Sequence, residues 1–327
     1  MVIMLVAITF AFVTGCSHGR DAERKSQGYI VKDYKNKVQI LKKNATFEMY
    51  THNPKLPPFI VRANSLGIRD REYPLGKPPG TLRIVILGDS FLFGWGVEQD
   101  ETFDEQLERI YKKRGRKVEV INLAIPGQNH ISELKMLKSI GLKYDPDIVL
   151  MQVNLDDFYP DYNNYIFKDM PVLPHGFESF SNEKRFDRTK EKFMTRFNRI
   201  RNAGELENND FMKLFDVFAA KPITEAAEIT KKNDIELTLL MNMDNPMVPA
   251  YKQLAEKLNI RTIDMYSAQF NPPLEFARNM KPLFIEKDGH PTAFALAIFA
   301  RYVADNLELP PTNPTSEQKT DSPAAIK

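Results

Sequence analysis

The chain is poor in the residues that build disulfide frameworks and metal centres. Its 327 residues include one cysteine, Cys16, and five histidines. A single cysteine cannot form an intrachain disulfide, and the histidines and acids lack the spacing of a zinc or calcium site. A glycine-rich phosphate loop is also missing from the sequence. We therefore expect neither a metal nor a cofactor.

The sequence also lacks an excess of charge of either sign. Lys and Arg number 45 against 43 Asp and Glu, so the formal net charge is +2. Without a basic block or basic residues interleaved with aromatics, a nucleic-acid partner is not expected. Hydrophobic residues make up 43% of the chain and charged residues 27%, which is typical of a globular protein with a sizeable core.

The N-terminus, MVIMLVAITFAFVTGC, is a short apolar run that ends at Cys16. It has the length of a signal-peptide core and is short for a membrane span. Residues 1–16 resemble a bacterial lipoprotein signal, whose Val-Thr-Gly-Cys box is cut before a lipidated cysteine; an ordinary secretory signal and a core segment are the alternatives. We expect residues 17–28 to be a tether and lipid on Cys16 to anchor the protein in the cell envelope, at the outer membrane in a Gram-negative cell.

Five apolar runs alternate with helical stretches along most of the remaining chain. The runs are nearly continuous rather than alternating, which is typical of strands buried on both faces of a parallel sheet. This order predicts an α/β protein, a three-layer α/β/α flavodoxin-like sheet. The predicted strands cover 82–88, 118–124, 147–153, 235–241 and 261–265, and the predicted helices 100–115, 132–143, 222–233, 249–258 and 292–307.

Three regions do not fit this alternation. Residues 29–80 are Pro-rich and irregular, and we expect them to wrap the edge of the sheet. Residues 159–220 predict a helical insertion above the carboxyl ends of the strands, where open α/β sheets bind their ligands. The tail, 310–327, is rich in Pro, Ser and Thr and predicts disorder. Residues 29–309 are therefore expected to form one domain.

Two short motifs, GDS and DGHP, have the residue types of nucleophilic catalysis. Ser90 directly follows the first predicted strand, where a turn into a helix exposes a hydroxyl and aims N–H groups at it. Asp288 and His290 lie just before the last predicted helix, where an imidazole could face the strand ends. Taken alone, GDS is a weak signal, because many strands end in such a turn that caps a helix, and DGHP is better explained as a surface loop.

Four blocks taken together resemble the SGNH, or GDSL-type, hydrolase family. They are GDSFLFGWGV, INLAIPGQN, VNLDDF and DGHP, which come in the order of the family's motifs. The upstream NSLGIRD also resembles envelope-associated members, and the resemblance runs from about Asn64 to Leu307. It implies the SGNH hydrolase fold and a hydrolase ancestry.

The resemblance also implies a role for individual residues. Ser90 would be the nucleophile, His290 the general base and Asp288 the acid that orients it, with Glu286 in reserve. The backbone N–H groups of Ser90 and Gly127 would donate to the oxyanion. No metal or cofactor is implied.

The third oxyanion donor departs from the family's pattern. Aligned on the strand before it, the family's asparagine falls on Asp156 and its glycine on Asn154. A carboxylate there would repel a developing oxyanion, and losing one donor typically costs about a hundred- to a thousandfold in turnover. Three interpretations follow: Asn154 reaches the hole instead, Asp156 is protonated, or the site is weakened.

The function that the resemblance implies is a serine esterase acting on short acyl esters, such as O-acetyl groups on an envelope glycan. An O-acyltransferase using the same triad, and a catalytically weakened binding or assembly lipoprotein, are the alternatives. Among the other candidates, His130 is expected to begin a helix, His52 and His175 lie in irregular segments, and Trp95 is expected to pack beside the first helix.

Overall fold

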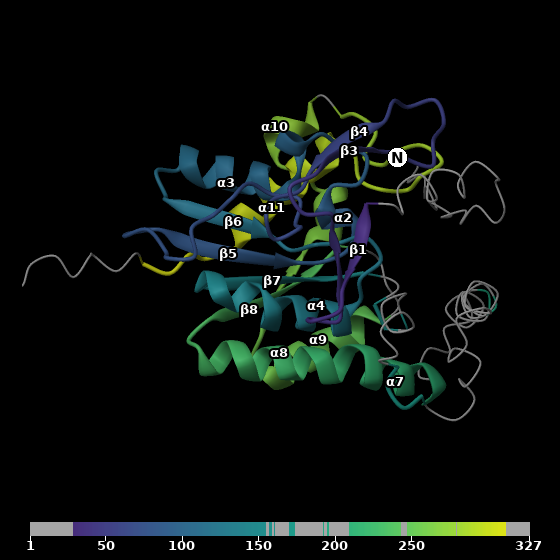
Figure 1. The fold of residues 1–327 in the computed structure, drawn as a ribbon, viewed down its shortest axis with the longest axis vertical. Coiled ribbons are helices and arrows are strands. Elements are labelled where there is room, and N and C mark those ends of the chain that lie inside the picture. The colour runs from purple at the N-terminus through teal and green to yellow at the C-terminus, as the bar shows by residue number, and fades with distance from the viewer. Residues whose placement is uncertain are drawn as a thin grey trace, which may run out of the picture.

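A five-stranded parallel sheet with the order β6-β5-β7-β8-β9 forms the centre of the molecule (Figure 1). The computed structural model describes residues 29–154, 157–158, 160, 170–173, 192, 195, 209–242, 247–278 and 280–311. Every residue of β5 and β7 is buried, as expected for strands covered on both faces. The strands are β5 (Leu82–Leu87), β6 (Val118–Asn122), β7 (Ile148–Val153), β8 (Glu236–Met241) and β9 (Arg261–Asp264), each within its predicted range.

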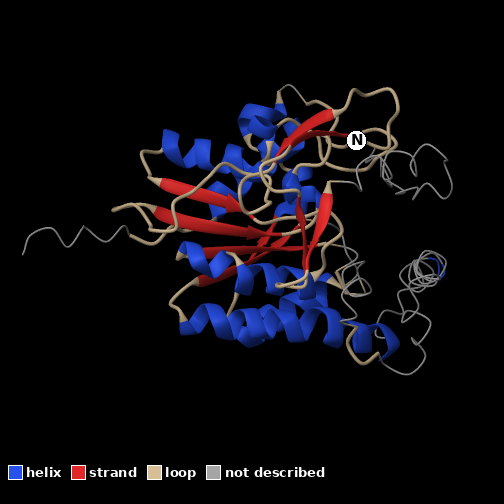
Figure 2. Cartoon of the chain, viewed as in Figure 1, coloured by secondary structure: helices blue, strands red, loops and turns tan. Residues whose placement is uncertain are grey.

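Helices cover both faces of this sheet, which confirms the predicted α/β/α architecture. Helices α3 (Phe103–Lys113) and α11 (Ala293–Asn306) lie on one face, and α4 (His130–Ser139), α8 (Lys221–Lys232) and α9 (Val248–Leu258) on the other (Figures 1 and 2). The short helical segments are α2 (Ser90–Phe93), η1 (Gln99–Glu101), η2 (Gly141–Tyr144), η6 (Met265–Gln269) and α10 (Leu274–Ala277).

Of the predicted insertion, the structure describes residues 160, 170–173, 192 and 195 and, at its end, residues 209–220. There α7 (Asn209–Phe215) continues through a π-helical segment, η5 (Asp216–Ala220), into α8. The predicted signal peptide, tether and nearly all of the predicted tail lie outside the described residues. Within the ranges given above, no helix is long and apolar enough to cross a membrane.

The segment that precedes β5 contains more regular structure than its proline content predicts. Strand β1 (Ile30–Asp33) pairs with β2 (Val38–Leu41), and β3 (Thr46–Met49) pairs with β4 (Phe59–Arg62), both antiparallel. The prediction of an irregular segment was wrong here. Each ladder is four residues long and buries apolar side chains against the main core, so packing rather than strand length stabilises it.

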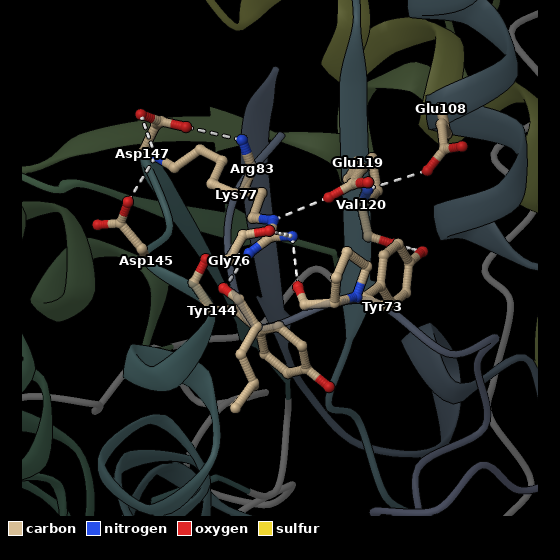
Figure 3. Close-up of polar contacts among 12 residues, drawn as sticks. Tyr73, Gly76, Lys77, Arg83, Glu108, Glu119, Val120, Tyr144, Asp145 and Asp147 are labelled. Carbon is tan, nitrogen blue, oxygen red and sulfur yellow. Dashed lines mark hydrogen bonds and ion pairs between the residues drawn. The ribbon is translucent and has the colours of Figure 1, made fainter. Parts of the chain in front are cut away.

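The same segment then runs along the free edge of β6, as predicted. The Tyr73 hydroxyl donates to the carbonyl of Val120 over 2.9 Å, and the Asp70 carboxylate accepts the N–H of Asn122 over 2.9 Å. Glu108 of α3 accepts the N–H of Val120 over 3.0 Å (Figure 3). Side chains thus satisfy edge groups that could otherwise pair with another chain.

A buried arginine joins this segment to the amino end of the sheet. Arg83 is the second residue of β5, and its side chain is fully buried. Its guanidinium forms an ion pair with Glu119 of β6 over 2.8 Å (Figure 3). It also donates to four carbonyls, those of Pro74, Leu75, Gly76 and Tyr144. Because the planar guanidinium can satisfy several acceptors at once, it ties the incoming chain to the sheet.

Replacing Arg83 by methionine is expected to lower the free energy of unfolding by about 3–5 kcal/mol, because Glu119 and the carbonyls lose a buried partner. Denaturant titration measures the loss. Lys77→Met is the matched control: it removes a partly exposed cation that pairs with Asp145 and Asp147, and is expected to cost about 1 kcal/mol or less. Equal losses of free energy of unfolding in the two variants would show that the buried contacts of Arg83 stabilise the fold no more than the exposed ion pairs of Lys77.

Two buried carboxyl groups face each other where this segment meets α3. Burial raises the pKa of Asp104 to about 6, although Asn122 donates to it over 2.7 Å. Burial, together with the neighbouring Asp104, raises the pKa of Asp70 well above its ordinary value. Oxygens of these two groups and of Glu105 lie within 4.8 Å of one another. The two carboxyl groups therefore keep their protons to a higher pH in the folded protein than in the unfolded chain.

This pair predicts a loss of stability as the pH rises. A carboxyl group whose pKa is raised on folding contributes stability that is full below about pH 4 and is lost as the pH passes about 6. Asp104→Asn lacks this titration, so the difference in free energy of unfolding between the variant and wild type should shift in favour of the variant by on the order of 2 kcal/mol from pH 4 to pH 7. The control is Asp100→Asn, at an exposed position in η1, whose stability should change with pH as that of wild type does. Parallel stability curves for wild type and Asp104→Asn would contradict the prediction.

Candidate active site

Ser90 lies at the carboxyl end of β5, which runs between β6 and β7 in the sheet, and begins α2. The preceding Asp89 caps this helix, its side chain accepting the N–H of Phe91 over 2.9 Å. Gly88 lies close to β7: a Cβ there would lie 2.4 Å from the side-chain oxygen of Gln152, which would have to shift. The helix ends after one turn at Gly94, in the left-handed conformation. The serine is therefore presented on a tight turn beside a packed strand.

His290 reaches Ser90 from a loop 200 residues further along the chain, just before α11. Its Nε2 lies 2.7 Å from the Ser90 Oγ, and its Nδ1 lies 2.5 Å from an oxygen of Asp288. The loop is held by a hydrogen bond from the N–H of Ile285 to the carbonyl of His290, over 2.8 Å. The structure thus brings all three predicted triad residues together in one series of hydrogen bonds.

Asp288 is the acid of this series, and its side chain is fully buried. Burial raises its pKa, but the hydrogen bond and charge of His290, with a further contribution from His52, bring that pKa below its ordinary value. An ionised carboxylate is what a histidine needs to stay in the tautomer with the proton on Nδ1. Glu286, the reserve candidate, is exposed.

His52 is a site residue that the sequence interpretation missed. Its backbone N–H donates to the second oxygen of Asp288 over 2.5 Å, and its ring Nδ1 lies 3.4 Å from the same oxygen. The two residues are 236 positions apart. Within the sequence, His52 has no partner at a recognisable spacing, so no local signal could have identified it.

The oxyanion donors predicted within the described residues, Ser90, Gly127 and Asn154, follow β5, β6 and β7 in the chain. Gly127 is exposed after β6, with a φ of +76° and open space where a Cβ would be. Asn154 is buried after β7, and its side-chain amide donates to Asp89, the residue before Ser90. The backbone N–H of Asn154 donates to Asp157 over 2.5 Å. Asp156 lies outside the described residues.

A second group of polar side chains is buried beside these loops. His130 begins α4, as predicted, and is fully buried. Its Nδ1 lies 2.8 Å from Glu133, and its Nε2 lies 3.1 Å from the Tyr251 hydroxyl and 3.6 Å from Asp157. Burial lowers the pKa of His130, so its neutral form is favoured. Through these contacts, α4 and α9 are joined to Asp157, which accepts the backbone N–H of Asn154.

Trp95 packs directly against the proposed base. It is buried, as predicted, and its ring centroid lies 5.5 Å from that of His290 and 5.7 Å from that of Phe59. Arg69, in the NSLGIRD motif, donates to the carbonyls of Phe93 and Gly94 and is itself buried. It also donates to carbonyls at Ile60 and Val97. The turn that carries Trp95 is thereby fixed to the N-terminal segment.

Comparisons with known proteins identify structures of similar fold. No family model matches the sequence, and no curated protein matches it. Similar solved structures include a G-D-S-L family protein from Desulfitobacterium hafniense, at 16% identity and a TM-score of 0.41, covering 69% of this chain and 99% of that one. A lipase/acylhydrolase from Enterococcus faecalis has 15% identity and a TM-score of 0.42, with coverage of 69% and 97%. The esterase EstA from Pseudoalteromonas sp. has 15% identity and a TM-score of 0.41, with coverage of 68% and 94%.

The first of these structures belongs to the family that the sequence motifs resemble. The geometry of this chain is the independent evidence: a serine, a histidine and an aspartate are hydrogen-bonded in series at the carboxyl end of a parallel α/β sheet. Such a series is suited to nucleophilic attack on an acyl carbon.

Proposed function

We propose that the protein is a serine esterase of the SGNH type, with Ser90 as nucleophile, His290 as general base and Asp288 as the orienting acid. The observation that carries the proposal is the distance of 2.7 Å between the Ser90 Oγ and the His290 Nε2. A serine hydroxyl is a weak nucleophile until a base removes its proton, and here a base lies within hydrogen-bonding distance. The buried carboxylate on the far side of the ring completes the series.

The reaction proceeds in two halves. As the Ser90 oxygen bonds to the ester carbonyl carbon, its proton passes to Nε2 of His290, and the carbonyl oxygen becomes an oxyanion. The imidazolium then gives this proton to the departing alcohol, which leaves an acyl group on Ser90. Water attacks the acyl-enzyme with His290 again as base, and release of the acid restores the serine. Asp288 stabilises the imidazolium in both halves.

The oxyanion would be held by the backbone N–H groups of Ser90 and Gly127 and by the side chain of Asn154. Supporting the choice of Asn154 over Asp156 is its hydrogen bond to Asp89, directly beside the nucleophile. An amide also supplies N–H donors, which a carboxylate lacks. The esterase proposal therefore does not depend on protonation of Asp156.

Asn154→Ala is expected to lower kcat about a hundredfold and to change KM little, because the donor acts mainly on the transition state. Steady-state hydrolysis of an aryl acetate measures both constants. The control is Asn242→Ala, which removes another buried amide at the end of the neighbouring strand β8 and should change kcat less than about threefold. Equal effects in the two variants would indicate general disturbance of the strand ends.

The proposed substrate is a short acyl ester, such as an O-acetyl group on an envelope glycan. Support comes from the family resemblance and from the predicted lipid anchor on Cys16, which would place the enzyme in the bacterial cell envelope. Mass spectrometry of the mature N-terminus tests the anchor: the wild-type protein should begin at Cys16 with lipid attached, and Cys16→Ser should carry none. A mature wild-type protein without lipid on Cys16 would exclude the lipid anchor.

The test of the proposed function is hydrolysis of an aryl acetate by wild type and by Ser90→Ala. We expect wild type to turn over and the variant to lose about five to six orders of magnitude in kcat. Equal rates would remove the esterase proposal. Adding an acetyl-free glycan separates hydrolysis from transfer: an esterase yields acetate, whereas a transferase consumes the donor faster and acetylates the glycan.

A further inference from the structure

The carboxylate of Asp288 is held between two histidines. One of its oxygens faces His290, and the other accepts the backbone N–H of His52 over 2.5 Å. The His52 Nδ1 lies 3.4 Å from that second oxygen. Because the side chain of Asp288 is fully buried, these contacts fix how the carboxylate faces its partners.

The loop between β3 and β4 carries His52 into this position. Thr51 and Asn53, on either side of it, are buried, and the Thr51 hydroxyl donates to the carbonyl of Asn53 over 3.3 Å. The loop meets the turn that follows α2: a Cβ on Gly96 would lie 2.9 Å from the Thr51 methyl group and would also collide with Ile285. Three segments far apart in the sequence thus pack together around Asp288.

Trp95 packs beside both imidazole rings. Its ring centroid lies 6.2 Å from that of His52 and 5.5 Å from that of His290. A shared aromatic neighbour restricts the positions of the two rings. The His52 side chain nevertheless remains 30% exposed, so a change of its ring can be made without leaving a large cavity.

We propose that His52 is a positioning residue for the triad, which holds Asp288 in the orientation that keeps His290 directed at Ser90. This inference rests on the proposed function. Without the His52 ring, the second oxygen keeps only the backbone N–H of residue 52, so the carboxylate is held less firmly about its Cβ–Cγ bond and the partner of the His290 Nδ1 is less well fixed. The cost then falls on the step in which His290 becomes an imidazolium, since that cation depends on a correctly placed carboxylate.

The decisive variant is His52→Ala, which keeps the backbone N–H and removes only the ring. We expect kcat for an aryl acetate to fall about tenfold and KM to stay within about twofold, the effect of weakening one contact to a charged group. His52→Asn returns an N–H donor near the position of Nδ1 and should recover most of kcat. Lys55→Ala, an exposed position in the same loop, is the matched control and should match wild type.

A second measurement reports the reactivity of the Ser90 hydroxyl without turnover of substrate. The rate at which an aryl phosphonate labels Ser90, followed by mass spectrometry, should fall in His52→Ala by about the same factor as kcat. Thermal melting of each variant shows whether the fold is kept. If His52→Ala melts below the assay temperature, His52→Asn and its labelling rate decide the question.

The possible results separate this inference from the proposed function. Wild-type kcat in His52→Ala, or a change in KM alone, would overturn the positioning role while leaving the esterase intact. If kcat of His52→Asn is as low as that of His52→Ala, the role assigned to the ring nitrogen is wrong. Full activity in Ser90→Ala would instead overturn the proposed function, whatever the His52 variants do.

Discussion

His290→Ala is expected to lower kcat for aryl acetate hydrolysis by about five to six orders of magnitude, as much as Ser90→Ala does, and the double variant should be no slower than either. The reason is that the hydroxyl and the imidazole act as one unit. Without the base at 2.7 Å, the hydroxyl keeps its proton; without the hydroxyl, the base has no nucleophile to activate. Residual activity would come from the oxyanion donors and substrate binding alone.

Steady-state rates of the two single variants and the double variant test this coupling. Each variant should melt within a few degrees of wild type, since both side chains are small contributors to the core. Losses that multiply in the double variant would contradict the account, because they would show that Ser90 and His290 act in separate steps or separate sites.

Asp288→Asn is expected to lower kcat by about ten thousandfold. An amide in this place can donate to Nδ1 of His290, which favours the tautomer with the proton on Nε2; that nitrogen then cannot accept the proton of Ser90. The imidazolium also loses its counter-charge. Because the fully buried carboxylate has a pKa below its ordinary value, it is ionised at neutral pH, and the whole effect should be present there.

Glu286→Gln is the matched control for this substitution. It removes a carboxylate two residues earlier in the same loop, at an exposed position. We expect its kcat to equal that of wild type. A large fall in kcat for Glu286→Gln together with a small fall for Asp288→Asn would show that Glu286, and not Asp288, is the acid of the triad.

Local patterns were sufficient to predict the sheet and its helices. Strands β5 and β7 are mostly apolar and buried at every residue because both faces of the sheet are covered, and that signal is readable from sequence alone. Ser90 and His290 could be predicted for a different reason: the motifs that contain them resemble a hydrolase family when taken together. Each residue also stands where a parallel strand ends or a helix begins, and those ends meet at one edge of the sheet.

The contribution of the N-terminal segment could not be predicted in this way. Its two ladders consist of strands of four residues that pack on the main core, and the proline-rich stretches beside them hide so short a strand signal. His52 touches Asp288 only through the folded arrangement of segments 236 residues apart. The buried pair of Asp70 and Asp104 is equally hidden, since acids in a sequence ordinarily indicate an exposed surface.

The most direct test of the account is to trap the nucleophile. Wild-type protein treated with an aryl phosphonate ester should gain one phosphonyl group, located by peptide mass spectrometry on Ser90, with loss of the aryl alcohol. The same treatment of His290→Ala should leave Ser90 unmodified over the same time. Labelling of another residue, or equally fast labelling of Ser90 in His290→Ala, would contradict the claim that His290 activates Ser90.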